Sequence, residues 1–142
     1  MQLYELYKLI RRFEGFRAKP YLCPANVPTI GYGSTGPDIT LATPPVTLEW
    51  AEGRMQREAT LYAKAVLKLS PTLVSNNLAI SAMADFSYNL GLTRYKASTL
   101  RRRIQAGDIK GAKEELAKWV FGGGRKLPGL IARRAAEALL LS

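Results

Sequence analysis

The architecture of this chain is set by residues 14–33, which read EGFRAKPYLCPANVPTIGYG. Two short segments, residues 21–23 and 29–32, carry aromatic, aliphatic and β-branched side chains on either side of the turn-forming residues 24–26. This pattern predicts the two strands of a β-hairpin. Glycine would weaken an ordinary strand, so we expect a bulge or a close backbone approach in the second segment.

The segment before the hairpin predicts a helix. Apolar residues recur at steps of three and four over residues 3–13, which is the spacing of one helix face. Gly15 is suited to the left-handed position just past a helix end. Glu14 would therefore lie where the helix passes into the hairpin.

The rest of the chain predicts a loop and then a series of helices. Residues 36–46 are rich in Gly and Pro and read as a loop. The expected helices cover residues 48–69 with Thr47 as N-cap, 76–89, a short segment capped by Ser98 and ending at Gly107, a segment capped by Asp108, and 129–141. Residues 122–124 are three glycines and read as a flexible connection.

These elements predict an α+β fold with two lobes in one domain over residues 1–142. A small β-hairpin lobe (residues 14–46) would be joined by the long helix (48–69) to a mainly helical lobe (residues 1–13 and 70–142). A cleft between two lobes is the default place for a ligand. We therefore expect the site there.

Composition excludes several kinds of chemistry. The chain has one cysteine and no histidine among its 142 residues. Cys23 cannot form an internal disulfide, and imidazole-based metal sites and Ser/His or Cys/His nucleophile pairs are excluded. No metal or cofactor is expected, and acid–base chemistry falls to carboxylates, Cys, Lys or Tyr.

The formal net charge of +10 favours polyanionic partners such as cell wall, anionic lipid or nucleic acid. Basic clusters at residues 101–103, 125–126 and 133–134 could raise affinity for anionic envelope surfaces. A solvated basic surface explains the same charge equally well. The apolar side of the last helix could disturb membranes, although we expect it to be core.

Glu14 is the first candidate for chemistry. A carboxylate at the C-terminal end of a helix is mildly unfavourable, by roughly 0.3–1 kcal/mol, because the helix dipole is negative there. Such a junction can present a side chain to a cleft while rigid elements hold it. The alternative is a solvated glutamate at a helix terminus.

The spacing of Glu14, Cys23 and Thr29 resembles the catalytic spacing of the phage-type lysozymes, glycoside hydrolase family 24. The flanking residues resemble that family over nearly the whole chain, which implies that the single α+β domain is lysozyme-like. The matching segments are Phe13-Glu14-Gly15, Thr29-Ile30-Gly31-Tyr32-Gly33, Ser87-Tyr88-Asn89-Leu90-Gly91, Ser98-Thr99-Leu100, Ala106-Gly107-Asp108, Trp119 and residues 123–130.

This resemblance implies an endolysin that hydrolyses the β-1,4 bond between N-acetylmuramic acid and N-acetylglucosamine in peptidoglycan. Glu14 would give its proton to the leaving oxygen, and Thr29 would help to hold the attacking water. Tyr32 and Gly33 would line the near wall of the cleft and Tyr88 and Asn89 the far wall. Taken without the resemblance, Thr29 is an ordinary strand residue and Tyr88 packs in the core as readily as it binds sugar.

Cys23 departs from the aspartate that is usual in the family. An unperturbed thiol is only a few per cent ionised at pH 7, and a nearby carboxylate or a dry site would lower that fraction. Cys23 could position water, act as a nucleophile, replace aspartate poorly, or be a small buried hydrophobe; we favour water positioning. Ser34 stands where relatives often carry His, and we expect this to affect stability more than chemistry.

The resemblance also implies a place of action. No secretory signal or membrane span is evident, so the protein would be made in the host cytoplasm and act on the cell wall, in the periplasm, after release. We expect a monomer that does not bind nucleic acid. The rival interpretations are a peptidoglycan-binding module made inactive by Cys23, and a cationic protein that binds membranes or nucleic acid.

Overall fold

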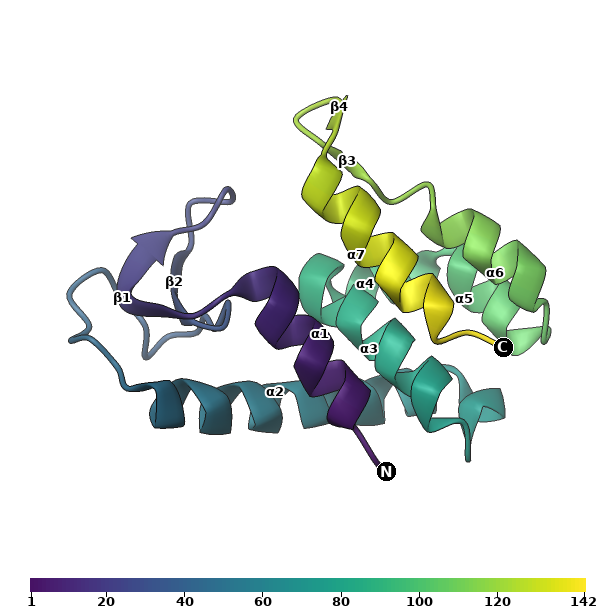
Figure 1. The fold of residues 1–142 in the computed structure, drawn as a ribbon, viewed down its shortest axis with the longest axis horizontal. Helices are drawn as coiled ribbons and strands as arrows, with labels where there is room; N and C mark the ends of the chain where they lie inside the picture. Colours follow the sequence, from purple (N-terminus) through teal and green to yellow (C-terminus); the bar gives the residue numbers. More distant parts are fainter. The chain divides into compact units, whose positions relative to one another are not determined.

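The computed structural model describes residues 1–142 and has an α+β fold (Figure 1). The chain divides into two compact units, residues 10–58 and residues 1–9 with 59–142. Both α1 (Tyr4–Glu14) and α2 (Leu48–Leu69) cross the border between the units. No helix combines the length and the apolar composition needed to cross a membrane.

The unit formed by residues 10–58 holds the predicted hairpin. β1 (Arg17–Leu22) pairs antiparallel with β2 (Pro28–Gly31), and the prediction of a hairpin is confirmed. The register pairs Tyr21 with Thr29 and shifts between Arg17 and Tyr21, so β1 carries an irregularity. At Gly31, where φ is +66°, a Cβ atom would lie 3.2 Å from the Ala51 side chain. The close backbone approach expected from the glycines is therefore found at Gly31.

The unit formed by residues 1–9 and 59–142 is mainly helical. Its remaining elements are η1 (Pro71–Leu73), α3 (Asn77–Leu90), α4 (Leu92–Ala97), α5 (Thr99–Gln105), α6 (Ile109–Leu116), β3 (Phe121–Gly122), β4 (Arg125–Lys126) and α7 (Pro128–Leu139). α7, the yellow helix of Figure 1, packs against α3 and α6. Fully buried apolar side chains form its core, among them Ala82, Met83, Phe86, Tyr95, Leu100 and Leu116.

The predicted helix signals are confirmed where caps mark them. Ser98 and Asp108 accept hydrogen bonds from backbone N–H groups at the starts of α5 and α6. Thr47 accepts a bond of 3.1 Å from the Trp50 N–H at the start of α2. Each cap satisfies a backbone donor that has no partner within its helix. The sequence analysis missed α4 and η1, which are both short.

The expectation of a flexible connection at residues 122–124 is wrong. Gly123 and Gly124 form the two-residue turn of a small hairpin that joins β3 to β4. Their φ angles are +57° and +78°, the left-handed values that a tight hairpin turn of this type needs at both central positions. The Leu127 N–H also donates to the Val120 carbonyl at 2.9 Å and closes the base of the hairpin.

The expectation that residues 133–134 add to a basic surface is also wrong. Arg133 and Arg134 lie on α7 with only 3% and 2% of their surfaces exposed. Arg133 donates to both oxygens of Asp85 at 2.9 and 2.8 Å, and Arg134 pairs with Glu137. These two arginines pair with buried acidic side chains, because an unpaired charge in the core costs several kcal/mol. They are not available to an anionic surface.

Candidate active site

Glu14 is the last residue of α1, and its side chain is half-buried. The helix stops because Gly15 takes a φ of +69° while its N–H still donates to the Arg11 carbonyl at 3.2 Å. The Glu14 carboxyl group packs on the backbone of Gly33, in the turn that follows β2. The predicted junction of helix and hairpin therefore holds this carboxyl group against the hairpin.

An ion pair anchors the end of α1 one turn before Glu14. Arg11 donates two hydrogen bonds to Glu52 of α2, from Nε at 2.6 Å and from Nη2 at 3.0 Å. Gln56 donates to the same carboxylate at 3.3 Å. The Arg11 guanidinium is the main reason that the pKa of Glu52 lies below its ordinary value. This two-point pairing restricts rotation of the helix end that carries Glu14.

Tyr32 belongs to the same cluster. Its ring lies 5.9 Å from the Phe16 ring, and its hydroxyl is hydrogen-bonded to Glu52. Burial, followed by the charge of Glu52, raises the pKa of the Tyr32 hydroxyl. Only 6% of Tyr32 is exposed, so a contact between Tyr32 and a sugar would be small.

Cys23 lies at the start of the hairpin turn, and its side chain is half-buried. The turn is closed by bonds from the Asn26 N–H to the Cys23 carbonyl (2.8 Å) and from the Cys23 N–H to the Val27 carbonyl (3.1 Å). The same curvature directs the N–H groups of Val27 and Ala25 toward the sulfur. The Val27 bond is the largest cause of a lowered thiol pKa. The sequence analysis considered only a nearby carboxylate or a dry site, which would raise the thiol pKa; burial does act in that direction, but the backbone hydrogen bonds outweigh it.

Thr29 lies on β2, across the hairpin from Tyr21, and is 2% exposed. Its hydroxyl donates to the Val27 carbonyl at 2.8 Å. A hydrogen bond between the Thr29 hydroxyl and Cys23 also lowers the pKa of the thiol. Since a hydroxyl has one proton, Thr29 accepts from the neutral thiol and can turn to donate to the thiolate. Cys23 and Thr29 therefore form one hydrogen-bonded pair.

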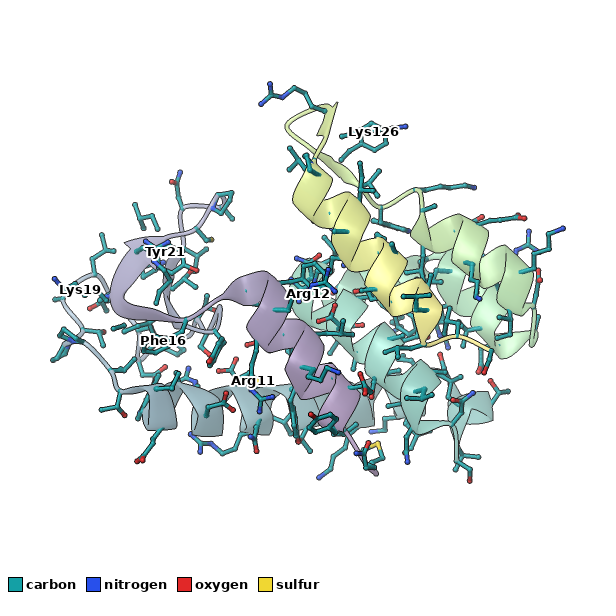
Figure 2. The ribbon with its side chains drawn as sticks, viewed as in Figure 1. Arg11, Arg12, Phe16, Lys19, Tyr21 and Lys126 are labelled. Carbon is teal, nitrogen blue, oxygen red and sulfur yellow. The ribbon has the colours of Figure 1, made fainter.

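Tyr21 is a site residue that the sequence analysis missed. It lies on β1 (Figure 2), with the Arg17 guanidinium 4.1 Å from the centre of its ring. Burial raises the pKa of the Tyr21 hydroxyl, and the charges of Glu14 and then Cys23 raise it further, against Arg17. Tyr21 thus lies within electrostatic reach of both Glu14 and Cys23. In the predicted hairpin Tyr21 lies across from Thr29, and this cross-strand pairing is the signal in the sequence that could have identified it.

Tyr88 and Asn89 belong to the other unit, in the last turn of α3. Both are half-buried, and the Tyr88 ring lies 5.4 Å from that of Tyr62. The Asn89 side chain accepts a hydrogen bond of 2.8 Å from Arg134. A pocket of about 290 Å³ also lies in this unit, and no predicted site residue lines it.

Comparison with known proteins agrees with this arrangement. The family model described as phage lysozyme matches residues 11–137. An endolysin of Acyrthosiphon pisum secondary endosymbiont phage 1 is 36% identical over 136 residues, which cover 93% of this chain and 91% of the relative. A SAR-endolysin of Bacteriophage PS119 is 36% identical over 87% of this chain and 73% of its own length.

Solved structures with the same fold include two peptidoglycan-related proteins. The endolysin from Escherichia coli O157:H7 phage FAHEc1 superposes with a TM-score of 0.80 at 29% identity, covering 99% of this chain and 92% of that one. The muramidase domain of SpmX from Asticaccaulis excentricus gives a TM-score of 0.82 at 26% identity, covering 98% and 96%.

The order of elements, a small N-terminal hairpin unit and a mainly helical unit, is the lysozyme-like fold that this chain shares with endolysins. The chain belongs to the phage lysozyme family. It is an enzyme of the endolysin type, which breaks down peptidoglycan.

Proposed function

We propose that this enzyme hydrolyses the β-1,4 bond between N-acetylmuramic acid and N-acetylglucosamine, with Glu14 as the general acid. The observation that carries the proposal is the contact of the Glu14 carboxyl group with Gly33, in the same unit as the Cys23–Thr29 pair. A glycosidase needs a proton donor for the leaving oxygen and a second group that controls water at the anomeric carbon. Glu14 and the Cys23–Thr29 pair supply these two functions.

The proton balance follows from these roles. Glu14 gives its proton to the bridging oxygen as the bond from that oxygen to the anomeric carbon breaks. Water forms the new bond to the anomeric carbon and releases one proton, and Glu14 regains a proton from solvent for the next turnover. The anchoring of α1 through Arg11 and Glu52 supports this role, because a general acid must be held within hydrogen-bond distance of its target.

Cys23 and Thr29 position the attacking water. While Cys23 is a neutral thiol, the Thr29 proton is used by the Val27 carbonyl and the Thr29 oxygen can accept a hydrogen bond from water. The lowered pKa of Cys23 gives a larger thiolate fraction than an ordinary cysteine has, and a thiolate accepts a hydrogen bond from water as an aspartate does. The turn around Cys23 thus compensates in part for the missing carboxylate.

Four further residues contact the glycan in this proposal. Gly33 leaves the space that the Glu14 carboxyl group occupies, and Tyr32 adds the small part of its surface that is exposed. In the other unit, Tyr88 offers an aromatic face for a pyranose ring, and Asn89 offers hydrogen bonds. We propose that the enzyme acts as a monomer on the cell wall of the phage host after release from the cytoplasm.

The substitution Glu14→Gln tests the proposal. Wild-type protein added to purified peptidoglycan should reduce turbidity and release muropeptides with new reducing ends. Glu14→Gln should abolish both effects while the melting temperature changes little, because the amide keeps the shape of the carboxyl group. The matched control is Glu5→Gln on the same helix, where the carboxylate faces Lys8 at 3.7 Å, and it should retain activity.

Other outcomes would favour the rival functions. If Glu14→Gln clears peptidoglycan as fast as the wild type, the acid assignment is wrong. If the wild type binds peptidoglycan without releasing reducing ends, the chain is a binding module. If bacterial killing survives Glu14→Gln without new reducing ends, the protein acts on membranes.

A further inference from the structure

Arg134 makes contacts that exceed those of a simple ion pair. It lies on α7 and is 2% exposed. Its Nε lies 2.7 Å from Glu137 Oε1, and its Nη2 donates to Glu137 Oε2 at 2.9 Å. The same Nη2 donates to Asn89 Oδ1 at 2.8 Å. The two hydrogens of Nη2 are therefore divided between the carboxylate on α7 and the amide on α3.

The guanidinium is fixed by its surroundings. It lies 5.1 Å from the centre of the Phe86 ring, which belongs to α3 and is fully buried. Nη1 also approaches the Trp119 carbonyl at 3.5 Å, a marginal hydrogen bond. Glu137 lies along the other edge of the guanidinium, where Nη2 donates to Oε2 and Nε lies close to Oε1 without a hydrogen bond of good geometry. A planar cation held between a ring face and an acidic side chain keeps the second N–H of Nη2 in a fixed direction, toward Asn89.

This direction determines which way the Asn89 amide faces. An arginine has donors and no acceptor, so the atom of Asn89 that faces it must be the carbonyl oxygen. The Nδ2 group, with its two N–H donors, is then directed away from Arg134. Asn89 as a residue is half-buried and so is not fully closed off from solvent. Since Oδ1 accepts from Arg134, the N–H donors are the groups of the Asn89 amide that face away from Arg134.

We propose that Arg134 is a positioning residue that holds Asn89 with its N–H donors toward the glycan, so that this subsite selects an acceptor oxygen such as the carbonyl of an N-acetyl group. The proposal rests on the proposed function, because it takes Asn89 as a glycan contact. It adds the cause of the amide orientation and the chemical type of the substrate group. Arg134 does not touch the glycan, and its effect passes through Asn89.

Steady-state kinetics on soluble, un-cross-linked glycan strands test this assignment. Arg134→Lys keeps the charge but loses the planar fork, so it should raise KM roughly three- to tenfold, the equivalent of one hydrogen bond, with kcat nearly unchanged. Asn89→Ala should raise KM by a similar factor. Asn89→Asp should do the same, because it pairs with Arg134 but has no donor for an acceptor oxygen.

The double variant distinguishes positioning from general destabilisation. If Arg134 acts through Asn89, adding Arg134→Lys to Asn89→Ala should cause no further rise in KM. The matched control is Tyr95→Phe, which removes a buried hydrogen bond of 2.7 Å to Ser70 in the same unit. It should lower the melting temperature and leave KM unchanged.

A second measurement does not depend on the stability of the arginine variant. In the Glu14→Gln protein, the side-chain N–H signals of Asn89 should shift in a ¹⁵N NMR spectrum when glycan strands are added. Unmoved signals, or KM effects of Arg134→Lys and Asn89→Ala that multiply in the double variant, would overturn the proposal. Either result leaves the role of Glu14 intact, since that role is tested separately by the loss of cleavage in Glu14→Gln.

Discussion

The carboxyl group of Glu14 lies directly over the backbone of Gly33, so that a Cβ atom at residue 33 would be 2.5 Å from Glu14 Oε1. Real Cβ atoms do not approach an oxygen so closely, and any side chain there must displace the carboxyl group. Gly33 also takes a φ of +78°, which L-residues rarely adopt. The position of the proposed acid therefore depends on the absence of one methyl group.

Gly33→Ala should reduce activity on peptidoglycan by about 100-fold, because a displacement of about 1 Å at a reacting group has effects of that size. It should also lower the free energy of unfolding by about 1–2 kcal/mol through backbone strain. Initial rates of turbidity loss and a urea melt measure the two effects. Gly107→Ala is the control, since Gly107 has a φ of +71° and no neighbouring atom within 4 Å. Gly107→Ala should lower the free energy of unfolding without a loss of activity. Equal losses of activity in Gly33→Ala and Gly107→Ala would contradict the proposed contact between Glu14 and Gly33.

Cys23 should titrate below the ordinary pKa of a thiol, because the Val27 and Ala25 N–H groups stabilise the thiolate. The rate of alkylation by iodoacetamide as a function of pH gives this midpoint. Thr29→Val removes a hydrogen bond to the sulfur and should move the midpoint upward, whereas Thr29→Ser keeps the hydroxyl and should move it little. Alkylation should also slow turnover. A midpoint at or above that of free cysteine would show that the turn does not stabilise the thiolate.

Much of the fold could be predicted because its signals are local. Helix bounds follow from apolar periodicity and from caps such as Ser98 and Asp108, and these act within one turn of chain. The hairpin followed from strand-forming segments around a turn. By contrast, Gly123 and Gly124 fit both a flexible connection and a tight turn. The bond from the Leu127 N–H to the Val120 carbonyl, outside the glycine run, closes the hairpin.

The parts that could not be predicted depend on contacts between distant residues. Arg133 and Arg134 look like surface charge in sequence. The partner of Arg133 is Asp85, 48 positions earlier, and Arg134 donates to Asn89, 45 positions earlier. The direction in which the pKa of Cys23 is shifted depends on where the backbone N–H groups of its turn point. Residue types alone do not reveal this. Sequence identified Glu14, Cys23 and Thr29 by resemblance, and their roles remain predictions. The supporting contacts of Glu52, Tyr21 and Arg134 needed the structure.

Ser34 provides a test of stability at the position where relatives often carry His. It is 1% exposed, and its hydroxyl has no hydrogen-bond partner. Burial of an unpaired hydroxyl costs about 1 kcal/mol or more. Ser34→Ala should therefore raise the melting temperature by about 2–4 °C without loss of activity.

Ser70→Ala is the control with the opposite expected sign. The Ser70 hydroxyl is equally buried, but it is hydrogen-bonded to Tyr95 at 2.7 Å, so its loss should lower the melting temperature. An unchanged or lower melting temperature in Ser34→Ala would contradict the cost assigned to the Ser34 hydroxyl.

The ionisation of Glu137 should lower the stability of the folded state as the pH rises. Burial, followed by a hydrogen bond with Asp85, raises its pKa well above 4.5, against the charges of Arg134 and Arg133. The folded state thus binds this proton more tightly than the unfolded state, so its contribution is full below about pH 4.5 and is lost as pH rises through the folded pKa. Glu137→Gln cannot ionise. In urea melts at a series of pH values, this variant should gain stability relative to the wild type as the pH rises above about 4.5.

Glu52→Gln should behave in the opposite sense, because Arg11 lowers the pKa of Glu52 and the ionised carboxylate stabilises the folded state. Its stability relative to the wild type should fall as pH rises through the range in which unfolded glutamate ionises. Both variants replace one ionisable carboxyl group with an amide, so the comparison isolates the environment of that group. The stability of each variant relative to the wild type could instead change with pH in the same direction. Net charge, rather than the two environments, would then govern the titration, and the buried proton assigned to Glu137 would have to be abandoned.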